Sequence, residues 1–457
     1  MLSGIKSIYI IGIGGVSMSA LALMLKDRGI IVKGSDIHLS EMTAKLASQG
    51  IEVVEGEAPF FVDECDAVLY TGAIGENNSD FVYAQKLGKP LFSRAEILGM
   101  FSCEKKTISI SGTHGKTTTT GMISTILLEG GYDPTIHIGG ELKSIKSNLH
   151  IGQSDIFITE ACEYKDAFLS LKSHISVVLN IEEDHLDYFK NFDNIISSFN
   201  KFIQNTDENG FVVYNYDNCQ EKLKNLKSKK TISFGLNKCA DLRAENIFEY
   251  KKGRFCFDAF WKSQFVGQFQ LSAIGRHNIY NALASIAVCL ALGVDRAKIS
   301  SGLLNFQGVG RRMEIIREEN PFVIHDYAHH PQEIEASLNA IKSLGENKII
   351  CIFQPHTFSR TKALYGQFLK CFLHCEEVWL LPIYPAREKS IKFVNSQNLS
   401  KDLRKNHIKS RFFRKFSSCK KEIAKKQYQN YTFAVLGAGN IEELAKLIKS
   451  QYSQNLD

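Results

Sequence analysis

The residues with the most specific chemical signal form a short glycine- and threonine-rich segment, Ser111–Thr118, with the sequence SGTHGKTT. It joins a predicted strand to a predicted helix, so its backbone N–H groups lie at the positive end of the helix dipole, where phosphate binds well. Lys116 is expected to reach the β- and γ-phosphates of ATP, and the Thr117 hydroxyl to bind Mg²⁺. The turn is a shortened phosphate loop, because Ile110 stands where the general pattern has its first glycine. The residues predicted to bind ATP here are Gly112, Thr113, His114, Gly115, Lys116, Thr117 and Thr118.

Acidic residues follow two later strands and are candidates for holding the metal. Glu160 stands at the carboxyl end of one predicted strand, and His185 lies in the loop after the next. Magnesium prefers oxygen ligands and keeps several waters, so one or two carboxylates beside a triphosphate suffice. We therefore predict that Glu160 binds the metal and that His185 helps to hold a second ion, with a purely structural His185 as the alternative. The alternative for Glu163 and Glu182–Asp184 is that they only solvate loops, which we expect for most of them.

A second glycine turn near the N-terminus, Gly12–Ser17, has the sequence GIGGVS and forms a weak dinucleotide-binding fingerprint. Ser17 replaces its third glycine, and Asp36 follows 24 residues after Gly12, where an acid often binds a ribose. Alone, this turn would suggest an NAD-dependent oxidoreductase, but the phosphate loop competes with that interpretation. The turn predicts only that a pyrophosphate binds. The substrate-binding residues predicted in this part of the chain are Gly12, Gly14, Gly15, Asp36 and Thr71.

Further polar residues are placed where they could bind a nucleotide or an anion. Asn278 and Asn281 are three residues apart at the start of a predicted helix, so they share one face and could bind a base edge, or else cap the helix. Arg312 precedes two polar loops, Asp326–Pro331 and Gln354–Thr361, each of which follows a predicted strand. An arginine can donate two hydrogen bonds to a phosphoryl group or to a carboxylate.

The candidate site residues can meet only in a fold that brings the ends of several strands together. Short β-branched runs alternate with loops and amphipathic helices, which indicates an α/β fold with mainly parallel sheets and ligands at the carboxyl ends of the strands. We predict three domains: residues 1–104, 105–310 and 311–457. The predicted strands are Ile8–Ile11, Ile30–Lys33, Ala67–Tyr70, Thr107–Ser111, Ile156–Thr159, Val177–Asn180, Phe211–Tyr214, Phe322–His325, Ile349–Phe353, Val378–Leu381 and Thr432–Leu436, with a β-rich stretch over Asp241–Phe269.

Composition narrows the class of protein. The 457 residues carry a formal net charge of +6, and the basic stretch Lys401–Lys426 is interpreted as the solvated face of helices rather than a nucleic-acid site. The eleven cysteines are scattered and odd in number, which is typical of a reducing compartment. No signal peptide and no apolar run of about 20 residues is apparent. We expect a cytoplasmic protein that binds neither nucleic acid nor membrane and is a monomer or homodimer.

Taken in order, the motifs resemble the Mur ligase family across the whole chain. Two of them, His329-His330-Pro331 and Gln354-Pro355-His356, are specific to one branch of that family and its close relative. The motifs that carry the resemblance are Gly12–Gly15 with Met18–Ala20, Gly112–Thr118, Glu160–Glu163, Asn180–His185, Gly275–Asn278, Arg311-Arg312, Asp326–Pro331 and Phe353–His356.

The resemblance implies an N-terminal Rossmann-like domain for a UDP-sugar, a central P-loop ATPase-like domain and a C-terminal Rossmann-like domain for an amino acid. It implies ATP- and Mg²⁺-dependent joining of L-alanine to the lactyl carboxylate of UDP-N-acetylmuramate through an acyl phosphate, for peptidoglycan precursors. A related ligase adding a preformed peptide or another amino acid is the alternative.

The resemblance also implies residue roles. Lys116, Glu160, His185 and Arg312 would be catalytic, and Thr117, Glu160 and His185 would bind metal. Asn278 and Asn281 would bind adenosine, Arg312 and Asp326 would close on the nucleotide, and Tyr327, His329 and Arg360 would line the alanine site. Three positions depart from the family pattern: His325 replaces an acid, Thr357 replaces an arginine found in some members, and Asn440 replaces a common aspartate.

Overall fold

A computed structural model describes residues 4–72, 74, 77–224, 226, 229–345, 348–386 and 388–453. The chain divides into two compact units. The first unit contains Met1–Phe248, Cys256–Ser272 and His277–Gln307, and the second contains Glu249–Phe255, Ala273–Arg276 and Gly308–Asp457.

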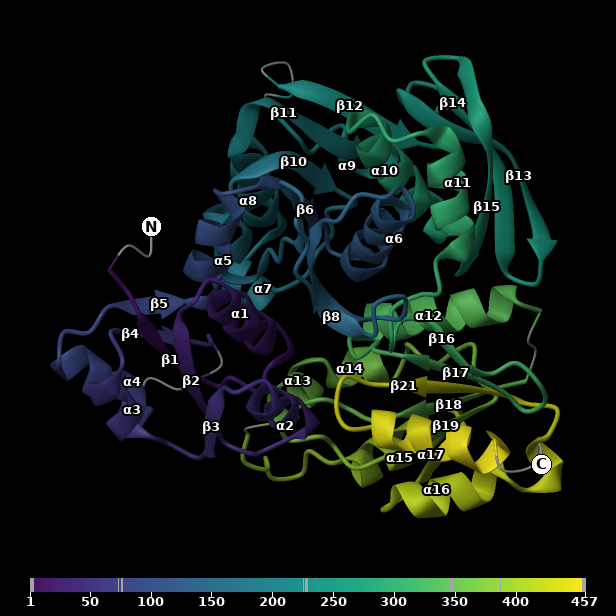
Figure 1. The fold of residues 1–457 in the computed structure, drawn as a ribbon. Coiled ribbons are helices and arrows are strands. Elements are labelled where there is room, and N and C mark those ends of the chain that lie inside the picture. The colour runs from purple at the N-terminus through teal and green to yellow at the C-terminus, as the bar shows by residue number, and fades with distance from the viewer. Residues whose placement is uncertain are drawn as a thin grey trace. The chain divides into compact units, whose positions relative to one another are not determined.

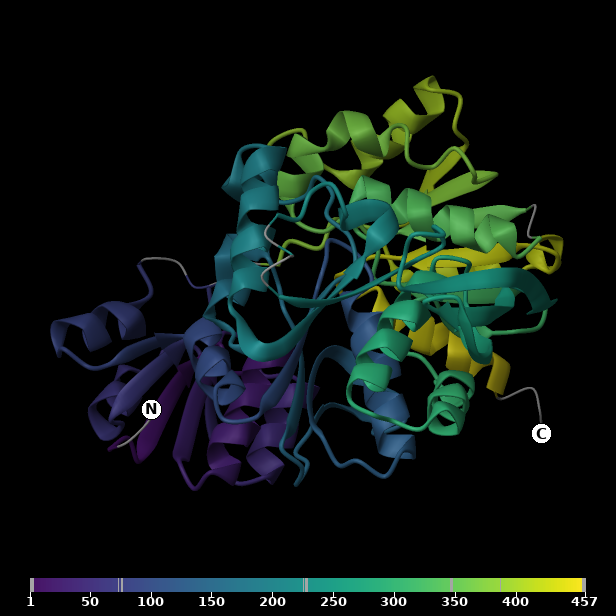
Figure 2. The same ribbon diagram turned by 90° about the horizontal axis from the view of Figure 1, so that it is seen from above.

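The N-terminal sheet of the first unit is parallel throughout, with the strand order β3-β2-β1-β4-β5 (Figures 1 and 2). Residues of α1, α2 and α5 share a hydrophobic core with one face of β1, and residues of α3 and α4 share a core with the other. The strand order reverses between β1 and β4, so the residues after these two strands meet at a switch point where ligands bind in such sheets. The elements are β1 (Ser7–Ile11), α1 (Val16–Asp27), β2 (Ile31–Asp36), α2 (Glu41–Ser48), β3 (Glu52–Glu55), α3 (Pro59–Glu64), β4 (Ala67–Tyr70), α4 (Ser79–Lys86), β5 (Leu91–Ser93) and α5 (Arg94–Ser102).

The central sheet has ten strands in the order β15-β14-β13-β12-β11-β10-β6-β9-β7-β8. From β7 to β13 the pairings are parallel, and β8 is antiparallel to β7. Its strands are β6 (Lys106–Ser111), β7 (Thr135–Leu142), β8 (Ser147–His150), β9 (Ile156–Glu160), β10 (Ser173–Val178), β11 (Thr206–Asn215), β12 (Lys230–Gly235), β13 (Leu242–Lys251), β14 (Arg254–Trp261) and β15 (Gln264–Ile274). Its helices are α6 (Lys116–Glu129), the 3₁₀ helix η1 (Tyr164–Ser170), α7 (Leu186–Phe189), α8 (Phe192–Gln204), α9 (Tyr216–Cys219), α10 (Asn278–Ala291) and α11 (Arg296–Asn305).

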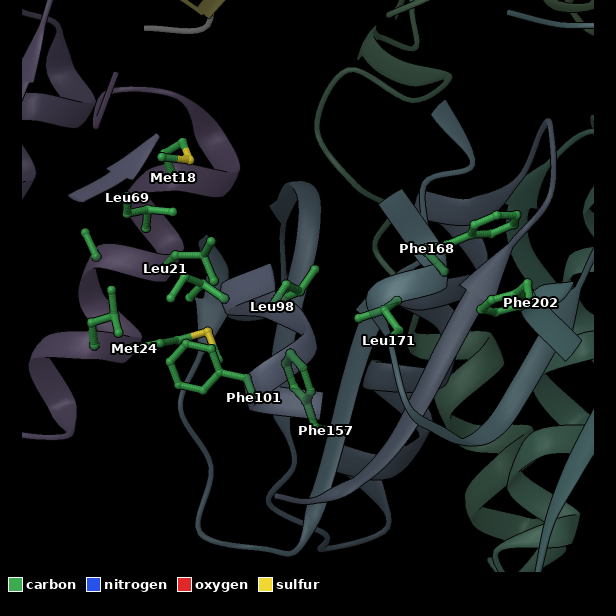
Figure 3. Packing of buried hydrophobic residues seen from close by; sticks show 14 of the residues in the cluster. Met18, Leu21, Met24, Leu69, Leu98, Phe101, Phe157, Phe168, Leu171 and Phe202 are labelled. Carbon is green, nitrogen blue, oxygen red and sulfur yellow. The ribbon is translucent and has the colours of Figure 1, made fainter. Parts of the chain in front are cut away.

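One continuous core joins the N-terminal and central sheets. Met18, Leu21 and Met24 of α1 belong to the same buried cluster as Leu98 and Phe101 of α5 (Figure 3). The cluster continues into the central sheet region through Phe157, Phe168, Leu171 and Phe202. Burying this apolar surface between the two sheets stabilises their arrangement, because each buried side chain contributes about 1.5–3 kcal/mol.

The C-terminal sheet, in the second unit, has the strand order β16-β17-β21-β18-β19-β20. All of its pairings are parallel except that of the edge strand β16 with β17. Alternate residues of β18 belong to two different cores, so both faces of this strand are buried. The elements are β16 (Glu314–Arg317), β17 (Phe322–Asp326), α12 (Pro331–Ser343), β18 (Ile349–Phe353), α13 (Phe358–Ala363), α14 (Tyr365–Phe368), β19 (Glu377–Leu380), α15 (Ser396–Lys405), β20 (Ser410–Phe412), α16 (Phe416–Ile423), η3 (Lys426–Tyr428), β21 (Thr432–Leu436) and α17 (Glu442–Ser453).

The structure confirms the predicted α/β class with three mostly parallel sheets. The β-rich stretch Asp241–Phe269 corresponds to β13, β14 and most of β15. The prediction of a strand over Val177–Asn180 was wrong at both ends, because β10 begins at Ser173 and ends at Val178. Asn180 instead lies in the loop after β10, where its side chain hydrogen-bonds to the turn that follows β6. Among the described residues, no helix has the length and apolar character needed to span a membrane.

Candidate functional site

The glycine turn between β6 and α6 has the backbone shape of an anion-binding site. Gly115 has φ +87°, and a Cβ at this position would lie 2.5 Å from the Asn281 side-chain oxygen. Gly112 has φ +137°, and a Cβ there would lie 2.9 Å from Cβ of Leu179. No side chain of the described residues caps the start of α6, so its first N–H groups remain available to a ligand.

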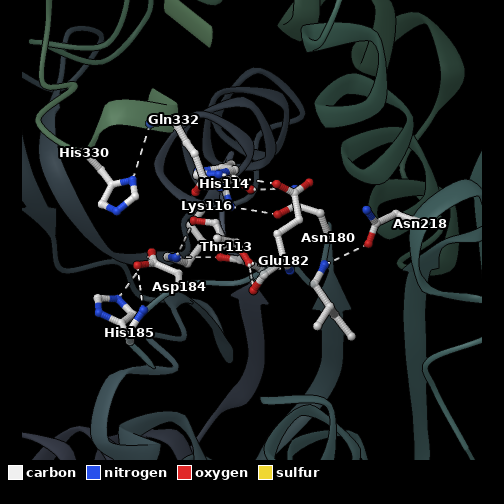
Figure 4. A network of polar contacts seen from close by, with 12 residues as sticks. Thr113, His114, Lys116, Asn180, Glu182, Asp184, His185, Asn218, His330 and Gln332 are labelled. Atoms are coloured by element: carbon white, nitrogen blue, oxygen red, sulfur yellow. Dashed lines mark hydrogen bonds and ion pairs between the residues drawn. The ribbon is translucent and has the colours of Figure 1, made fainter. Parts of the chain in front are cut away.

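Asn180 holds this turn in place from the loop after β10 (Figure 4). Its Oδ1 accepts a hydrogen bond from the His114 N–H at 2.8 Å, and its Nδ2 donates to the His114 carbonyl at 3.0 Å. Thr113 Oγ1 accepts from the Glu182 N–H at 3.0 Å. This role of Asn180 was not predicted from the sequence. The available signal was an amide, which both donates and accepts, placed directly after a neighbouring parallel strand.

Lys116 is held at the turn as a half-buried cation beside a buried carboxylate. Its Nζ donates to the Gly112 carbonyl at 2.5 Å and lies 3.1 Å from both carboxylate oxygens of Glu163. Burial is the largest single effect and lowers the pKa of Lys116, but the charge and hydrogen bond of Glu163 together with the neighbouring Cys162 and Glu160 outweigh it, and the pKa is raised. The side chain of Glu163 is only 3% exposed, so the alternative that it only solvates a loop is wrong for this residue.

One group of side chains in the described part of the chain offers a metal-ligand set. Ligand atoms of Glu163, Asp184 and His185 all lie within 4.8 Å of one another. His185 has φ +52°, and its Nε2 is 3.6 Å from Asp184 Oδ2. The ring of Tyr164 packs against the imidazole with centroids 4.6 Å apart. Carboxylate oxygens beside an imidazole suit a divalent cation.

The other two predicted metal ligands occupy different surroundings. Glu160 is the last residue of β9, and its Oε1 accepts from the Gly139 N–H of β7 at 2.6 Å. Thr117 lies in the first turn of α6 and is 5% exposed. The structure therefore groups His185 with Glu163 and Asp184, and anchors Glu160 to the neighbouring strand.

The two predicted adenosine ligands pair with each other in the first turn of α10. Asn281 Nδ2 donates to Asn278 Oδ1 at 2.8 Å, and both residues are buried. The cap residue of the helix is His277, so Asn278 begins the helix and does not cap it. The close approach of Asn281 to Gly115 places this amide pair beside the glycine turn between β6 and α6, called the phosphate turn below.

The N-terminal glycine turn gathers its predicted residues at the switch point between β1 and β4. Asp36 Oδ2 accepts from the Gly14 N–H at 2.9 Å. A Cβ on Gly12, where φ is +78°, would lie 2.7 Å from Cγ2 of Thr71. Gly15 is the cap residue of α1. These residues form a turn that only glycine fits at its first position.

In the second unit, the predicted residue Asp326 is held by backbone N–H groups, and the predicted Arg312 lies over the ring of Tyr327. Asp326, at the end of β17, is buried and accepts from the N–H groups of Met313 at 2.6 Å and Ala328 at 2.9 Å. Burial raises the pKa of Asp326. The guanidinium carbons of Arg311 and Arg312 lie 4.7 and 5.1 Å from the ring centroid of Tyr327.

His329 and Arg360 meet around His356. The two imidazole centroids are 5.9 Å apart, and Arg360 Nη1 lies 3.1 Å from His356 Nδ1. Since arginine only donates, His356 accepts, and burial followed by the Arg360 charge lowers its pKa to about 4. Glu333 Oε2 lies 3.3 Å from His329 Nδ1. The roles of Glu333 and His356 were not predicted from the sequence. For Glu333, the available signal was its spacing of four residues from His329.

The three departures from the family pattern are accommodated differently. His325 is 1% exposed, burial lowers its pKa to about 4, and no described group is within hydrogen-bonding distance of its Nε2. Thr357 has φ +65° and caps α13 by accepting from the Arg360 N–H at 3.4 Å. Asn440 Oδ1 accepts from Gln354 Nε2 at 2.8 Å, a contact that an aspartate could also make.

Three family models match consecutive parts of the chain. Residues 7–106 match "Mur ligase family, catalytic domain", residues 110–289 match "Mur ligase middle domain", and residues 311–439 match "Mur ligase, glutamate ligase domain".

Individual proteins match over almost the whole chain. A UDP-N-acetylmuramate–L-alanine ligase of Caldanaerobacter subterraneus is 41% identical over 449 residues, which is 97% of each chain. The crystal structure of a UDP-N-acetylmuramate–alanine ligase from Thermotoga maritima is similar with a TM-score of 0.81 and 28% identity, covering 99% of this chain and 100% of that one. A murein peptide ligase from Psychrobacter arcticus shares the fold with a TM-score of 0.72 and 21% identity, covering 97% of this chain and 98% of that one.

Proposed function

Because this chain belongs to the Mur ligase family, we propose that it uses ATP to join L-alanine to the lactyl carboxylate of UDP-N-acetylmuramate. The observation that carries the substrate assignment is its 41% identity, over 97% of both chains, to a ligase named for that reaction. The proposed reaction passes through an acyl phosphate and serves peptidoglycan precursor synthesis in the cytoplasm.

The phosphate turn supports the ATP part of the proposal. An ATP phosphate chain fits the N–H groups at the start of α6, and the absent Cβ of Gly115 leaves room beside Asn281. Lys116 is already charged and held at the turn by Glu163, so it needs no protonation to meet a phosphate. Asn278 and Asn281, beside the same turn, would bind the adenosine.

Acidic and imidazole groups beside the turn support the magnesium part. Glu163, Asp184 and His185 together present the oxygen and nitrogen atoms that a divalent cation needs. Thr117 and Glu160 would complete the set, with Glu160 leaving its contact with Gly139. When bound, Mg²⁺ would offset the negative charge of the phosphoryl group during transfer.

The second unit offers groups for the amino acid. Arg360 would hold the alanine carboxylate through two parallel hydrogen bonds, because its guanidinium matches the geometry of a carboxylate. Thr357 supplies no positive charge beside His356, so Arg360 would be the main clamp. Tyr327 and His329 would line the same site, and Arg312 and Asp326 would act on the nucleotide. Residues 1–104, 105–310 and 311–457 would form the UDP-sugar, ATP and amino-acid domains.

The test is phosphate release by the purified chain with ATP, Mg²⁺ and UDP-N-acetylmuramate, in separate reactions with L-alanine, glycine, L-serine and a preformed muropeptide. We expect release to be fastest with L-alanine and to require the nucleotide sugar. Release with the peptide alone would establish the alternative ligase, and no release in any reaction would refute the proposal. Carboxylate oxygen labelled with ¹⁸O should appear in the phosphate, and its absence would exclude the acyl phosphate.

A further inference from the structure

Ser17, which replaces the third glycine of the N-terminal turn, contacts a buried histidine of the central sheet. Ser17 Oγ lies 3.0 Å from His137 Nε2, although the two residues are 120 positions apart. His137 belongs to β7 and is 4% exposed. Arg94, the first residue of α5, donates to the same Ser17 oxygen at 3.3 Å.

The other imidazole nitrogen contacts the strand that ends in Glu160. His137 pairs directly with Thr159 across the parallel strands β7 and β9, and His137 Nδ1 lies 3.0 Å from Thr159 Oγ1. The Thr159 hydroxyl in turn donates to the carbonyl of Glu160 at 3.3 Å. Four contacts therefore connect Arg94 to Glu160 through three side chains.

The chemistry of the donors determines the direction of every hydrogen in this series. Thr159 gives its one hydroxyl hydrogen to the Glu160 carbonyl, so its oxygen must accept from Nδ1–H of His137. Burial, followed by the charge of Arg94, lowers the pKa of His137 to about 3, so the imidazole is neutral and Nε2 has no hydrogen. Nε2 must then accept from the Ser17 hydroxyl, whose oxygen accepts from Arg94. All four hydrogen bonds therefore point the same way, from the Arg94 guanidinium to the Glu160 carbonyl.

We propose that His137 is a positioning residue that fixes Ser17, and with it the N-terminal glycine turn, relative to the strand that carries Glu160. This inference rests on the proposed function, because the turn is where the nucleotide sugar would bind. The same strand, β7, also binds the Glu160 carboxylate through the Gly139 N–H. One strand thus contacts both the turn proposed for the nucleotide sugar and the end of the strand that carries Glu160.

The position of Ser17 explains why the fingerprint departs from glycine here. A glycine would leave His137 Nε2 buried without a donor, which is costly in a protein interior. The hydroxyl of Ser17 satisfies that nitrogen and remains half-buried at the start of α1.

The experiment measures KM for UDP-N-acetylmuramate and for ATP in the phosphate-release assay, using Ser17→Ala, His137→Leu and His137→Gln. Loss of one buried hydrogen bond should raise KM for the nucleotide sugar about tenfold in the first two variants and leave KM for ATP within about twofold. His137→Gln keeps an acceptor within reach of Ser17, so it should recover most of the affinity. Ser17→Ala removes one half-buried oxygen, so it tests the proposal if His137→Leu does not fold.

Asn148→Ala is the matched control. Asn148 Nδ2 donates to the Val16 carbonyl at 2.7 Å, so this variant removes another contact to the start of α1 without touching the series. We expect its KM for the nucleotide sugar to stay within about twofold of the wild type. An equal rise in Asn148→Ala, an unchanged KM in Ser17→Ala and His137→Leu, or a parallel rise in KM for ATP would each refute the positioning role. If the wild-type chain does not use UDP-N-acetylmuramate at all, the proposed function itself fails.

Discussion

Replacing Lys116 by alanine should destabilise the first unit as well as abolish activity. The substitution leaves the carboxylate of Glu163, which is 3% exposed, without its cation. Removing one partner of a buried ion pair typically costs about 3–5 kcal/mol, because the remaining charge stays out of water. The first unit has about 300 residues, so at an unfolding entropy of about 2.1 cal/mol/K per residue each kcal/mol lowers its melting temperature by about 1.6 °C. We therefore expect Lys116→Ala to melt about 5–8 °C below the wild type.

A double variant separates the stability of the pair from its role in catalysis. Adding Glu163→Gln to Lys116→Ala removes the uncompensated charge and should recover about half of the lost melting temperature, while phosphate release stays absent. Differential scanning calorimetry at pH 7 measures this directly. A Lys116→Ala variant that melts within about 2 °C of the wild type, or a double variant that melts no higher than the single one, would refute the reasoning.

The pH dependence of the melting-temperature difference between the wild type and Lys116→Ala supplies an independent check. The pKa of Lys116 is raised above its ordinary value of 10.5 in the folded protein, so the folded state holds this proton more tightly than the unfolded state. Its contribution to stability is then fully present below pH 10.5 and is lost as the pH rises through the folded-state pKa. The melting difference between the wild type and Lys116→Ala should stay constant from pH 6 to 9.

Three further substitutions test other parts of the site. Gly115→Ala should lower ATP-dependent phosphate release at least about 100-fold, because the new Cβ would lie 2.5 Å from an Asn281 oxygen and residue 115 would have to keep φ at +87°. Binding of the nucleotide sugar, measured by calorimetry, should not change. Arg360→Ala should raise KM for alanine about 100-fold and leave KM for ATP within about twofold; an unchanged alanine KM would place the carboxylate clamp elsewhere. Glu333→Gln should lose about 2–3 kcal/mol of stability at pH 7 and little at about pH 2. Equal losses at both pH values in denaturant titrations would contradict this.

The prediction for Glu333 follows from its surroundings. Burial alone would raise its pKa, but the nearby His329 and the N–H groups of His329 and His330 lower it to about 2. Burial lowers the pKa of His329, so that imidazole is neutral at pH 7 and the two N–H donors hold the carboxylate charge. A depressed acid pKa stabilises the fold above its ordinary value of 4.5, and that stability is lost as the pH falls from 4.5 to about 2.

Several elements could be predicted because their signals are local. Ala67–Tyr70 and Thr432–Leu436 form strands at the predicted bounds, since short apolar runs buried on both faces have few alternatives in an α/β fold. The turn before Lys116 was equally evident. Gly112 and Gly115 stand between a strand and a helix that begins with a lysine and two threonines, and both glycines have positive φ. These features depend on residues that are close in sequence.

Local sequence specifies which chemical groups are available and which turns present them: the phosphate turn, the N-terminal glycine turn and the polar loops after the C-terminal strands. Which of these groups meet depends on the three-dimensional fold. Glu163 holds Lys116 from 47 positions away, Asn180 holds His114 from 66, and His137 contacts Ser17 from 120. Such contacts depend on the order of strands in a sheet and on the packing of two sheets into one core, and local residue patterns carry no information about either.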